Sequence, residues 1–310
     1  MEHLICMQTG DLPDQFGWEK ACEMIAEAGF EGIDFNLDNS ILPSKIQSLQ
    51  YEGNCIFEKS LDQVEKYWEK AVSAIRKAGL QIRQAHSVYP TAVAGHPEVL
   101  EWTSRIHARA LEFADGLGCK YVVVHGIPLE ADNIHISQQE TDEMNMRLYE
   151  ALLSSLEGRK VICCLENLFI ISQGLYRQGA CANPEKAVQY IDALNAQAGR
   201  EAFGLCVDTG HLNLLATDFR SYGPVVGKRV KALHLNDNMG NRDSHRAPFS
   251  GSINWTVITD TLRQIGYEGD LSFETFFHTT AAFEYDPELV MPCLRMIAET
   301  GKVFRKHLFE

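Results

Sequence analysis

Several common sequence signatures are missing from this chain, and each absence excludes a class of protein. No segment reaches 18 consecutive apolar residues, so a membrane-spanning helix is not expected. Residues 1–10 show no basic region followed by an apolar stretch, which argues against a secretory signal. The nine cysteines form no C-x-x-C pair, and we expect them to be small buried residues in a reducing compartment. The protein is therefore expected to be cytoplasmic and to make no membrane contact.

Positive charge is also scarce. The sequence has 28 Lys and Arg residues against 42 Asp and Glu residues, a formal net charge of −14. Such a surface repels polyanions, and no Arg-rich loop interleaved with aromatic residues offsets it. Nucleic acid is therefore not expected as a partner.

The residues that are present indicate a soluble α/β protein. Hydrophobic residues make up 45% and charged residues 23% of the chain, which allows a large buried core. Short apolar runs alternate with longer amphipathic ones from end to end, the pattern of strands separated by helices. Eight strands are predicted, at His3–Gln8, Gly32–Asn36, Leu80–His86, Cys119–His125, Val161–Glu166, Gly204–Asp208, Val230–Leu235 and Leu271–Thr275.

The predicted helices have recognisable ends. Ser60 and Gln63 fit a capping box, after which apolar residues fall on one helical face at Val64, Tyr67, Trp68, Ala71, Val72 and Ile75. A glycine lies shortly before most strands, as a helix stop requires, at Gly29, Gly79, Gly118, Gly158, Gly199, Gly227 and Gly269.

Eight such units predict a (β/α)8 TIM barrel, taken as a single domain over residues 1–310. The alternative is an open doubly wound sheet, but its G-x-G-x-x-G turn is absent after the first strand. Two long connections, Leu37–Ser60 and Asn167–Pro184, follow the carboxyl ends of their strands. They are interpreted either as a rim or lid over the barrel mouth or as ordinary crossovers.

Histidines and carboxylates recur where the predicted strands end. In a barrel these ends share one mouth, so residues remote in sequence converge there. Imidazole and carboxylate without thiolate suit a divalent metal such as Mn²⁺, Zn²⁺, Co²⁺ or Mg²⁺. The strand ends carry His86, His125, Glu166, Asp208 with His211, His234 and Glu274, and the last loop adds Asp237, Asp243 and His245.

Each of these residues also has a structural interpretation. His86 and His125 could be hydrogen-bonded pocket histidines, Asp208 could cap a helix, and Asp243 with His245 could form a solvated turn. Glu166 and Glu274 each end an apolar run, so each needs a cation or a donor beside it. The remaining histidines are assigned to structure or to the surface: His3, His96, His107, His135, His278 and His307.

Five motifs resemble the xylose isomerase-like TIM barrel superfamily, which holds sugar isomerases and epimerases together with endonuclease IV. They are Cys164-Leu-Glu166-Asn167, Val207-Asp208-Thr209-Gly210-His211, Leu233-His234-Leu-Asn-Asp237-Asn238, Arg242 through Trp255, and Ser272-Phe273-Glu274-Thr275. The resemblance follows element order over nearly the whole chain.

The resemblance implies a metal held by Glu166, Asp208, His234 and Glu274. Glu166 and Glu274 would also be catalytic, exchanging a substrate proton through an enediolate. The implied activity is that of a metal-dependent isomerase or epimerase of a sugar, sugar phosphate or keto-polyol. An inosose dehydratase-type lyase would use nearly the same site and is a related alternative. His211 and Arg242 would hold substrate oxygens, and His86 and His125 would line the pocket.

The same resemblance leaves rivals open. An endonuclease IV-like phosphodiesterase would bind three metals, with His86, His125, His211, Asp243 and His245 as further ligands, although the acidic balance opposes DNA binding. A noncatalytic sugar-binding barrel is the third alternative. Barrels of this kind often pair, so a homodimer is a further expectation that no sequence feature tests.

Overall fold

The computed structural model describes residues 3–127 and 138–310. Eight strands form one sheet in the order β10-β1-β2-β3-β4-β5-β8-β9. Each predicted strand is present, with ends no more than two residues from those expected. The strands are β1 (Ile5–Gln8), β2 (Gly32–Asn36), β3 (Gln81–His86), β4 (Tyr121–Val124), β5 (Ile162–Glu166), β8 (Phe203–Asp208), β9 (Val230–His234) and β10 (Leu271–Phe273).

The two strands at the ends of this order also meet. Leu235, directly after β9, pairs in parallel with Phe273 of β10. The Leu235 amide donates to the Ser272 carbonyl oxygen at 2.8 Å, and the Glu274 amide donates to the Leu235 oxygen at 3.2 Å. The sheet therefore closes on itself. The predicted parallel eight-stranded barrel is confirmed, and the open doubly wound sheet is wrong.

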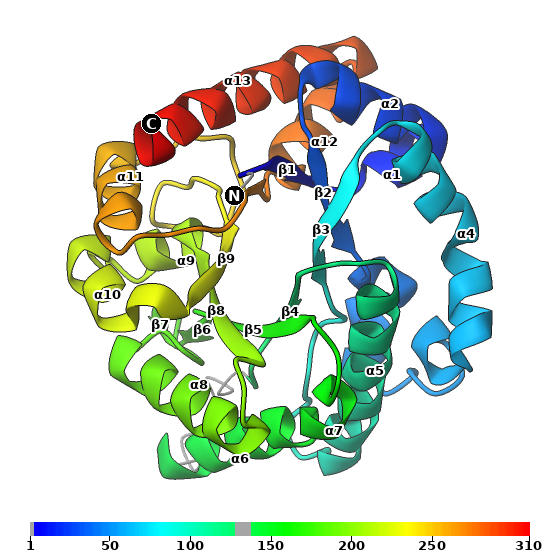
Figure 1. The fold of residues 1–310 in the computed structure, drawn as a ribbon, viewed down its shortest axis with the longest axis vertical. Helices are drawn as coiled ribbons and strands as arrows, with labels where there is room; N and C mark the ends of the chain where they lie inside the picture. The colour runs from blue at the N-terminus through cyan, green and yellow to red at the C-terminus, as the bar shows by residue number, and fades with distance from the viewer. Residues whose placement is uncertain (1–2, 128–137) are drawn as a thin grey trace. The chain divides into compact units, whose positions relative to one another are not determined.

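Helices follow the strands along the chain (Figure 1). None of the helices in the described ranges has both the length and the apolar character needed to cross a membrane. The α-helices are α1 (Leu12–Phe16), α2 (Trp18–Ala28), α3 (Pro43–Gln47), α4 (Leu61–Lys77), α5 (Pro97–Gly116), α6 (Gln138–Glu150), α7 (Leu153–Leu156), α8 (Pro184–Ala198), α9 (Thr209–Leu214), α10 (Phe219–Val226), α11 (Trp255–Gln264), α12 (Phe276–Tyr285) and α13 (Val290–Phe309).

The chain divides into two compact units. The first comprises Met1–Phe35, Trp68–Gln84 and Val207–Glu310, and the second comprises Asn36–Tyr67 and Ala85–Cys206. The boundaries at residues 35, 84 and 206 fall inside β2, β3 and β8 rather than in linkers. The single domain over residues 1–310 stays a prediction.

In the first unit the carboxy-terminal helix covers the strands next to it. Helix α13 packs on α2, β1 and β10, as its position in red in Figure 1 illustrates. Gly301 permits this approach, because a Cβ there would lie 2.6 Å from Ile5 and 2.9 Å from the Phe273 ring. The Phe304 ring stacks on Trp255 with centroids 5.3 Å apart, so the helix is held by aromatic packing.

In the second unit β4 and β5 pair in parallel, with Tyr121 opposite Ile162 and Val124 opposite Leu165. The Tyr149 hydroxyl of α6 donates to the Val124 oxygen at 3.0 Å, which fixes this helix to the strand. The register places Glu166, the last residue of β5, at the carboxyl edge of the sheet.

The two long connections have internal structure. The first contains the 3₁₀ turns at Asp38–Ser40 and Ile56–Glu58 on either side of α3, and buried Phe57 meets Phe113 of α5. The second forms an antiparallel hairpin that was not predicted, β6 (Phe169–Ser172) with β7 (Leu175–Gln178). Gln173 and Gly174 both have positive φ at its turn, the backbone that tight hairpins prefer.

Two details of the predicted helices need correction. The Gln63 side chain accepts from the Ser60 amide at 3.2 Å, as the capping box requires, but Tyr67 is 56% exposed and lies off the buried face. The helix stop before β10 is Gly266, with φ +66°, rather than Gly269. Glycine is required at position 269 for a different reason, because a Cβ there would clash with the Tyr267 side chain and with the main-chain oxygen of Lys231.

Candidate functional site

Three of the predicted metal ligands lie together in the first unit. Asp208 ends β8, His234 ends β9, and Glu274 follows β10 directly. One ligand atom from each lies within 4.8 Å of those of the other two, and all three side chains are buried. Because these strands run in parallel, their last residues reach the same edge of the sheet. The structure therefore brings these three side chains together, and their role as metal ligands stays a prediction.

Neighbouring side chains hold the Glu274 carboxylate in place. The Gln8 amide of β1 donates to Oε1 at 2.7 Å. Oε2 lies 3.4 Å from Nδ1 of His234 and 3.4 Å from Nδ1 of His245. The Gln8 amide thus holds Oε1 of this carboxylate, and its Oε2 faces one ring nitrogen each of His234 and His245.

Asp208 both caps a helix and faces the cluster. Its Oδ1 accepts from the His211 amide at 2.7 Å, at the start of α9, and Oδ2 accepts from the Asn236 amide at 2.7 Å. Gly210 must lack a side chain here, since a Cβ would lie 2.0 Å from Oδ1 of Asn236. The helix-cap interpretation is confirmed, and the cap fixes the direction of the carboxylate.

A second group in the same unit consists of His211, Asp243 and His245, whose ligand atoms also lie within 4.8 Å of one another. His245 Nε2 is 3.0 Å from Asp243 Oδ2, and His211 Nε2 is 3.7 Å from the same oxygen. The His245 ring packs on Phe276 and on the half-exposed Phe277, with centroid distances of 4.7 and 5.7 Å.

The charged forms of Asp243 and His245 in this second group stabilise each other. Burial by itself raises the pKa of Asp243, but the charge of His245 and the hydrogen bonds of His211 and His245 outweigh it and hold that pKa far below its usual value. Burial likewise lowers the pKa of His245, but the carboxylates of Glu274 and Asp243 outweigh it and raise this pKa well above its usual value. The two carboxylates thus favour the charged form of His245, and the charged His245 in turn favours the ionised form of Asp243.

Two predicted members of the last loop lie elsewhere. Arg242 is exposed and is not brought into either group, so its substrate role remains a prediction. Asp237 is fully buried and structural. Its Oδ2 accepts from the Trp255 indole at 3.0 Å, and its Oδ1 accepts from the amides of Asn238 and Ile253 at 2.9 and 3.2 Å.

In the second unit, His86, His125 and Glu166 form a third group with ligand atoms within 4.8 Å of one another. His125 Nε2 lies 2.8 Å from Glu166 Oε2 and 3.0 Å from His86 Nε2. The half-exposed Tyr89 ring packs on His125 with centroids 5.0 Å apart. Glu166 therefore has imidazole partners, as its position after an apolar run demands.

One histidine that was assigned to structure, His107, supports this group through Ser87. Ser87 lies between His86 and His107, its carbonyl oxygen 2.8 Å from His86 Nδ1 and its hydroxyl 2.8 Å from His107 Nδ1. Burial and the charges of His125 and His86 lower the pKa of His107 to about 3, so its ring is neutral at physiological pH. His135 lies outside the described residues.

Sequence reasoning missed the polar residues that orient the ligands, chiefly Gln8, Asp34 and Asn236. His234 Nε2 lies 3.2 Å from Oδ2 of Asp34, which is fully buried in β2. The available signal was a carboxylate in the middle of the apolar strand Gly32–Asn36, where an isolated charge is unfavourable. Because Asp34 lies in the middle of its strand, the pattern of histidines and carboxylates at strand ends does not include it.

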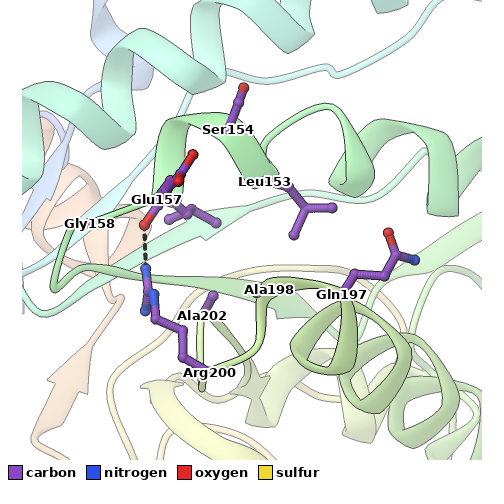
Figure 2. A pocket seen from close by; sticks show the side chains of 9 residues that line it. Leu153, Ser154, Glu157, Gly158, Gln197, Ala198, Arg200 and Ala202 are labelled. Atoms are coloured by element: carbon purple, nitrogen blue, oxygen red, sulfur yellow. Dashed lines mark hydrogen bonds between the residues drawn. The ribbon is translucent and has the colours of Figure 1, made fainter.

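A separate surface hollow lies at the opposite end of the second unit's strands. Figure 2 shows it between the end of α7 and the end of α8, lined by Leu153, Ser154, Glu157, Gln197 and Arg200. Ala202, which precedes β8, also lines it. The Arg200 guanidinium donates to the main-chain oxygen of Leu156, so a local hydrogen bond holds this side chain. None of the three groups of His, Asp and Glu side chains described above lines this hollow.

The donor set of the first group fits a divalent cation. Asp208 and Glu274 supply two buried carboxylates, and His234 supplies an imidazole nitrogen. Hard and borderline cations such as Mg²⁺, Mn²⁺, Co²⁺ and Zn²⁺ take such ligands, and three protein donors leave positions open for a further ligand or a substrate. The buried His, Asp and Glu groups could therefore bind a metal.

Known proteins are similar to this chain in sequence or in fold. The uncharacterized protein y4fM of Sinorhizobium fredii (strain NBRC 101917 / NGR234) is 24% identical over 263 residues, 84% of this chain and 81% of its own. The 3-keto-D-glucoside 4-epimerase YcjR from E. coli has a TM-score of 0.66 at 16% identity, covering 96% of this chain and 99% of that chain. The IOLI protein with a bound zinc atom has a TM-score of 0.65 at 19% identity, covering 99% and 100%. The family described as xylose isomerase-like TIM barrel matches residues 22–293, and the chain belongs to it.

Proposed function

We propose that this protein is a divalent-metal-dependent sugar isomerase or epimerase. The observation that carries the proposal is the gathering of Asp208, His234 and Glu274 ligand atoms within 4.8 Å at the carboxyl ends of three strands. Carboxylates are costly to bury without a counter-charge, so this arrangement is best explained by a cation. The class of reaction is supported by the epimerase with which the chain shares its fold.

Glu166 is proposed as the fourth ligand. In the parallel register it pairs with Cys206, two residues before Asp208 on the same strand. Paired residues of a sheet project to the same face, and so do alternate residues of one strand, which gives Glu166 and Asp208 a common face. With Glu166 included, the proposed site has two carboxylates available for proton transfer.

In the proposed reaction Glu166 and Glu274 exchange a substrate proton. One carboxylate removes a proton from the carbon beside the carbonyl group, and the other carboxylate returns a proton. Return to the opposite face of the same carbon gives the epimer. Return to the former carbonyl carbon gives the isomer, and the hydroxyl proton of the first carbon then passes to the former carbonyl oxygen. A bound divalent cation polarises the carbonyl and stabilises the negative charge that develops. Gln8 and His245 hold the Glu274 carboxylate in one orientation. The exposed edge of Phe277 offers an apolar surface to a sugar.

The solvent-hydrogen test follows from this proposal. A panel of ketoses and inososes in deuterium oxide, with added Mn²⁺, Co²⁺ or Zn²⁺, should yield one substrate that gains carbon-bound deuterium. Chelation should stop the exchange and the matching metal should restore it, measured by NMR and mass spectrometry. Exchange that survives complete chelation would contradict the proposed site. Loss of water from the substrate would identify the lyase, and metal binding with no turnover on any panel member would favour the noncatalytic barrel.

The charge of the interior favours a sugar without phosphate. Histidines aside, the buried charged side chains in the described part of the chain are all acidic: Asp34, Glu166, Asp208, Asp237, Asp270 and Glu274. A phosphate dianion near those at the carboxyl ends of the strands, such as Asp208 and Glu274, is repelled. We expect kcat/KM for the phosphorylated form of the substrate to be lower by about tenfold or more, roughly 1.4 kcal/mol of repulsion. Equal or faster turnover of the phosphate ester would overturn this substrate class without removing the metal site.

A phosphodiesterase is the second candidate, and a specific observation favours it. The further ligands that three metals would need do gather, in the groups His86, His125, Glu166 and His211, Asp243, His245. The net charge of −14 opposes binding to a DNA polyanion. Elemental analysis of the purified protein and incubation with abasic DNA decide between the two, since three metals per chain together with strand cleavage would replace the isomerase proposal.

A further inference from the structure

Asp34 is a buried carboxylate with three donors on one oxygen. It lies in the middle of β2 and is fully buried. Its Oδ2 accepts from Gln84 Nε2 of β3 at 2.6 Å and from Ser272 Oγ of β10 at 3.2 Å, and it lies 3.2 Å from His234 Nε2 of β9. These donors come from three different strands of the first unit. They fix the position of Asp34 Oδ2, and this oxygen in turn restrains the His234 ring.

We infer that Asp34 is a positioning residue that fixes the tautomer and ring orientation of His234 for metal binding. A carboxylate can only accept hydrogen bonds, so the neutral His234 ring places its proton on Nε2. The lone pair is then on Nδ1, the atom that lies 3.4 Å from Glu274 Oε2 within the ligand group. A carboxylate behind a ligating histidine also makes the ring a stronger donor to the cation.

The remaining contacts of this network keep Asp34 from turning away. Gln84 Nε2 also donates to the Leu233 oxygen at 3.3 Å, which ties the same amide to the residue before His234. Oδ1 of Asp34 is buried and has no hydrogen-bond partner among the described residues. The contacts that restrain the orientation of this carboxylate are therefore those made by Oδ2. A carboxylate needed only as a core acceptor would gain from pairing both oxygens.

The test compares Asp34→Asn with the control Ser272→Ala, which removes a donor to Asp34 but leaves the His234 contact intact. If the new amide faces His234, it forces the proton onto Nδ1; if its oxygen faces His234, the charge behind the ring is lost. Calorimetric titration with Mn²⁺ or Zn²⁺ should show Asp34→Asn weakened about 10- to 100-fold. Ser272→Ala should stay within about threefold of wild type.

A second measurement needs no variant at Asp34. In wild-type protein loaded with Zn²⁺ and labelled with ¹⁵N-histidine, the His234 signal, assigned by its loss in His234→Gln, should show the proton on Nε2. A proton on Nδ1, or equal metal affinity of Asp34→Asn and wild type, overturns the role of Asp34. The inference rests on the proposed metal site, and its failure is distinguishable, because a wild-type protein that binds no metal overturns both whereas unchanged binding in Asp34→Asn overturns only this one.

Discussion

Glu274→Gln is expected to lower substrate-dependent solvent-hydrogen exchange by about 10³-fold, within the range that a general acid or base contributes. The substitution keeps the size of the side chain and one ligand oxygen but removes the basic carboxylate. Gln8, which donates to Oε1 at 2.7 Å, can still orient the amide oxygen. Metal binding should therefore persist at lower affinity while proton transfer is lost.

Two measurements on the same preparations separate these effects. Deuterium incorporation gives the rate of proton transfer, and calorimetry with Mn²⁺ gives the metal affinity. Glu284→Gln on α12 is the matched control, since this glutamate is exposed and should keep wild-type exchange. If Glu274→Gln exchanges at the wild-type rate, Glu274 is not the proton-transferring group and the two-carboxylate proposal fails.

The barrel was predictable because its signals are local. A parallel strand buried on both faces appears as a short apolar run, as in Tyr121-Val122-Val123-Val124, and a helix stop appears as a glycine with positive φ, as at Gly118. Strand ends then follow from the runs themselves. Asp208, His234 and Glu274 could be found in this way, because a closed parallel sheet brings all such ends to one edge.

The orienting residues were not predictable in the same way because their partners are distant in sequence. Asp34 meets His234 across 200 positions of the chain, and Gln8 meets Glu274 across 266. Contacts over such long separations in sequence produce no periodic pattern from which they could be predicted. The hairpin β6–β7 was missed for a simpler reason, since Gln173-Gly174 is a weaker turn signal than Asn-Gly or Asp-Gly.

The sequence also could not distinguish a site for one metal from a site for three metals. The reason is that the same residue types serve as metal ligands, as hydrogen-bond partners and as balancing charges. His245 illustrates this, because it lies 3.4 Å from Glu274 and 3.0 Å from Asp243, and these carboxylates raise its pKa. A charged imidazole donates hydrogen bonds and has no lone pair for a metal, whereas a neutral one has a lone pair to offer. Counting bound metals is therefore more decisive than any further comparison of motifs.

The largest effect on stability is expected from Asp237→Ala, at a residue that resembles a site member in sequence but acts as an anchor. The substitution leaves the Trp255 indole and the amides of Asn238 and Ile253 without their acceptor in a fully buried place. Breaking such a network costs roughly 3 kcal/mol. For a chain of this length we expect Tm to fall by about 5 °C or more, measured by calorimetry.

The Asp237 side chain also fastens both ends of the loop that carries Asp243 and His245, because it accepts from the amides of Asn238 and Ile253, so its loss should also weaken the site. Asp237 and Arg246 exchange main-chain hydrogen bonds at 2.9 Å in both directions, directly after His245. Asp260→Ala is the control, because Asp260 is exposed on α11 and pairs with Arg263 at the surface. Its effect on the free energy of unfolding should stay within about 0.5 kcal/mol. If Asp237→Ala unfolds at the temperature of this control, the buried network is not what holds the loop, and the position of His245 must depend on its own contacts with Glu274 and Phe276.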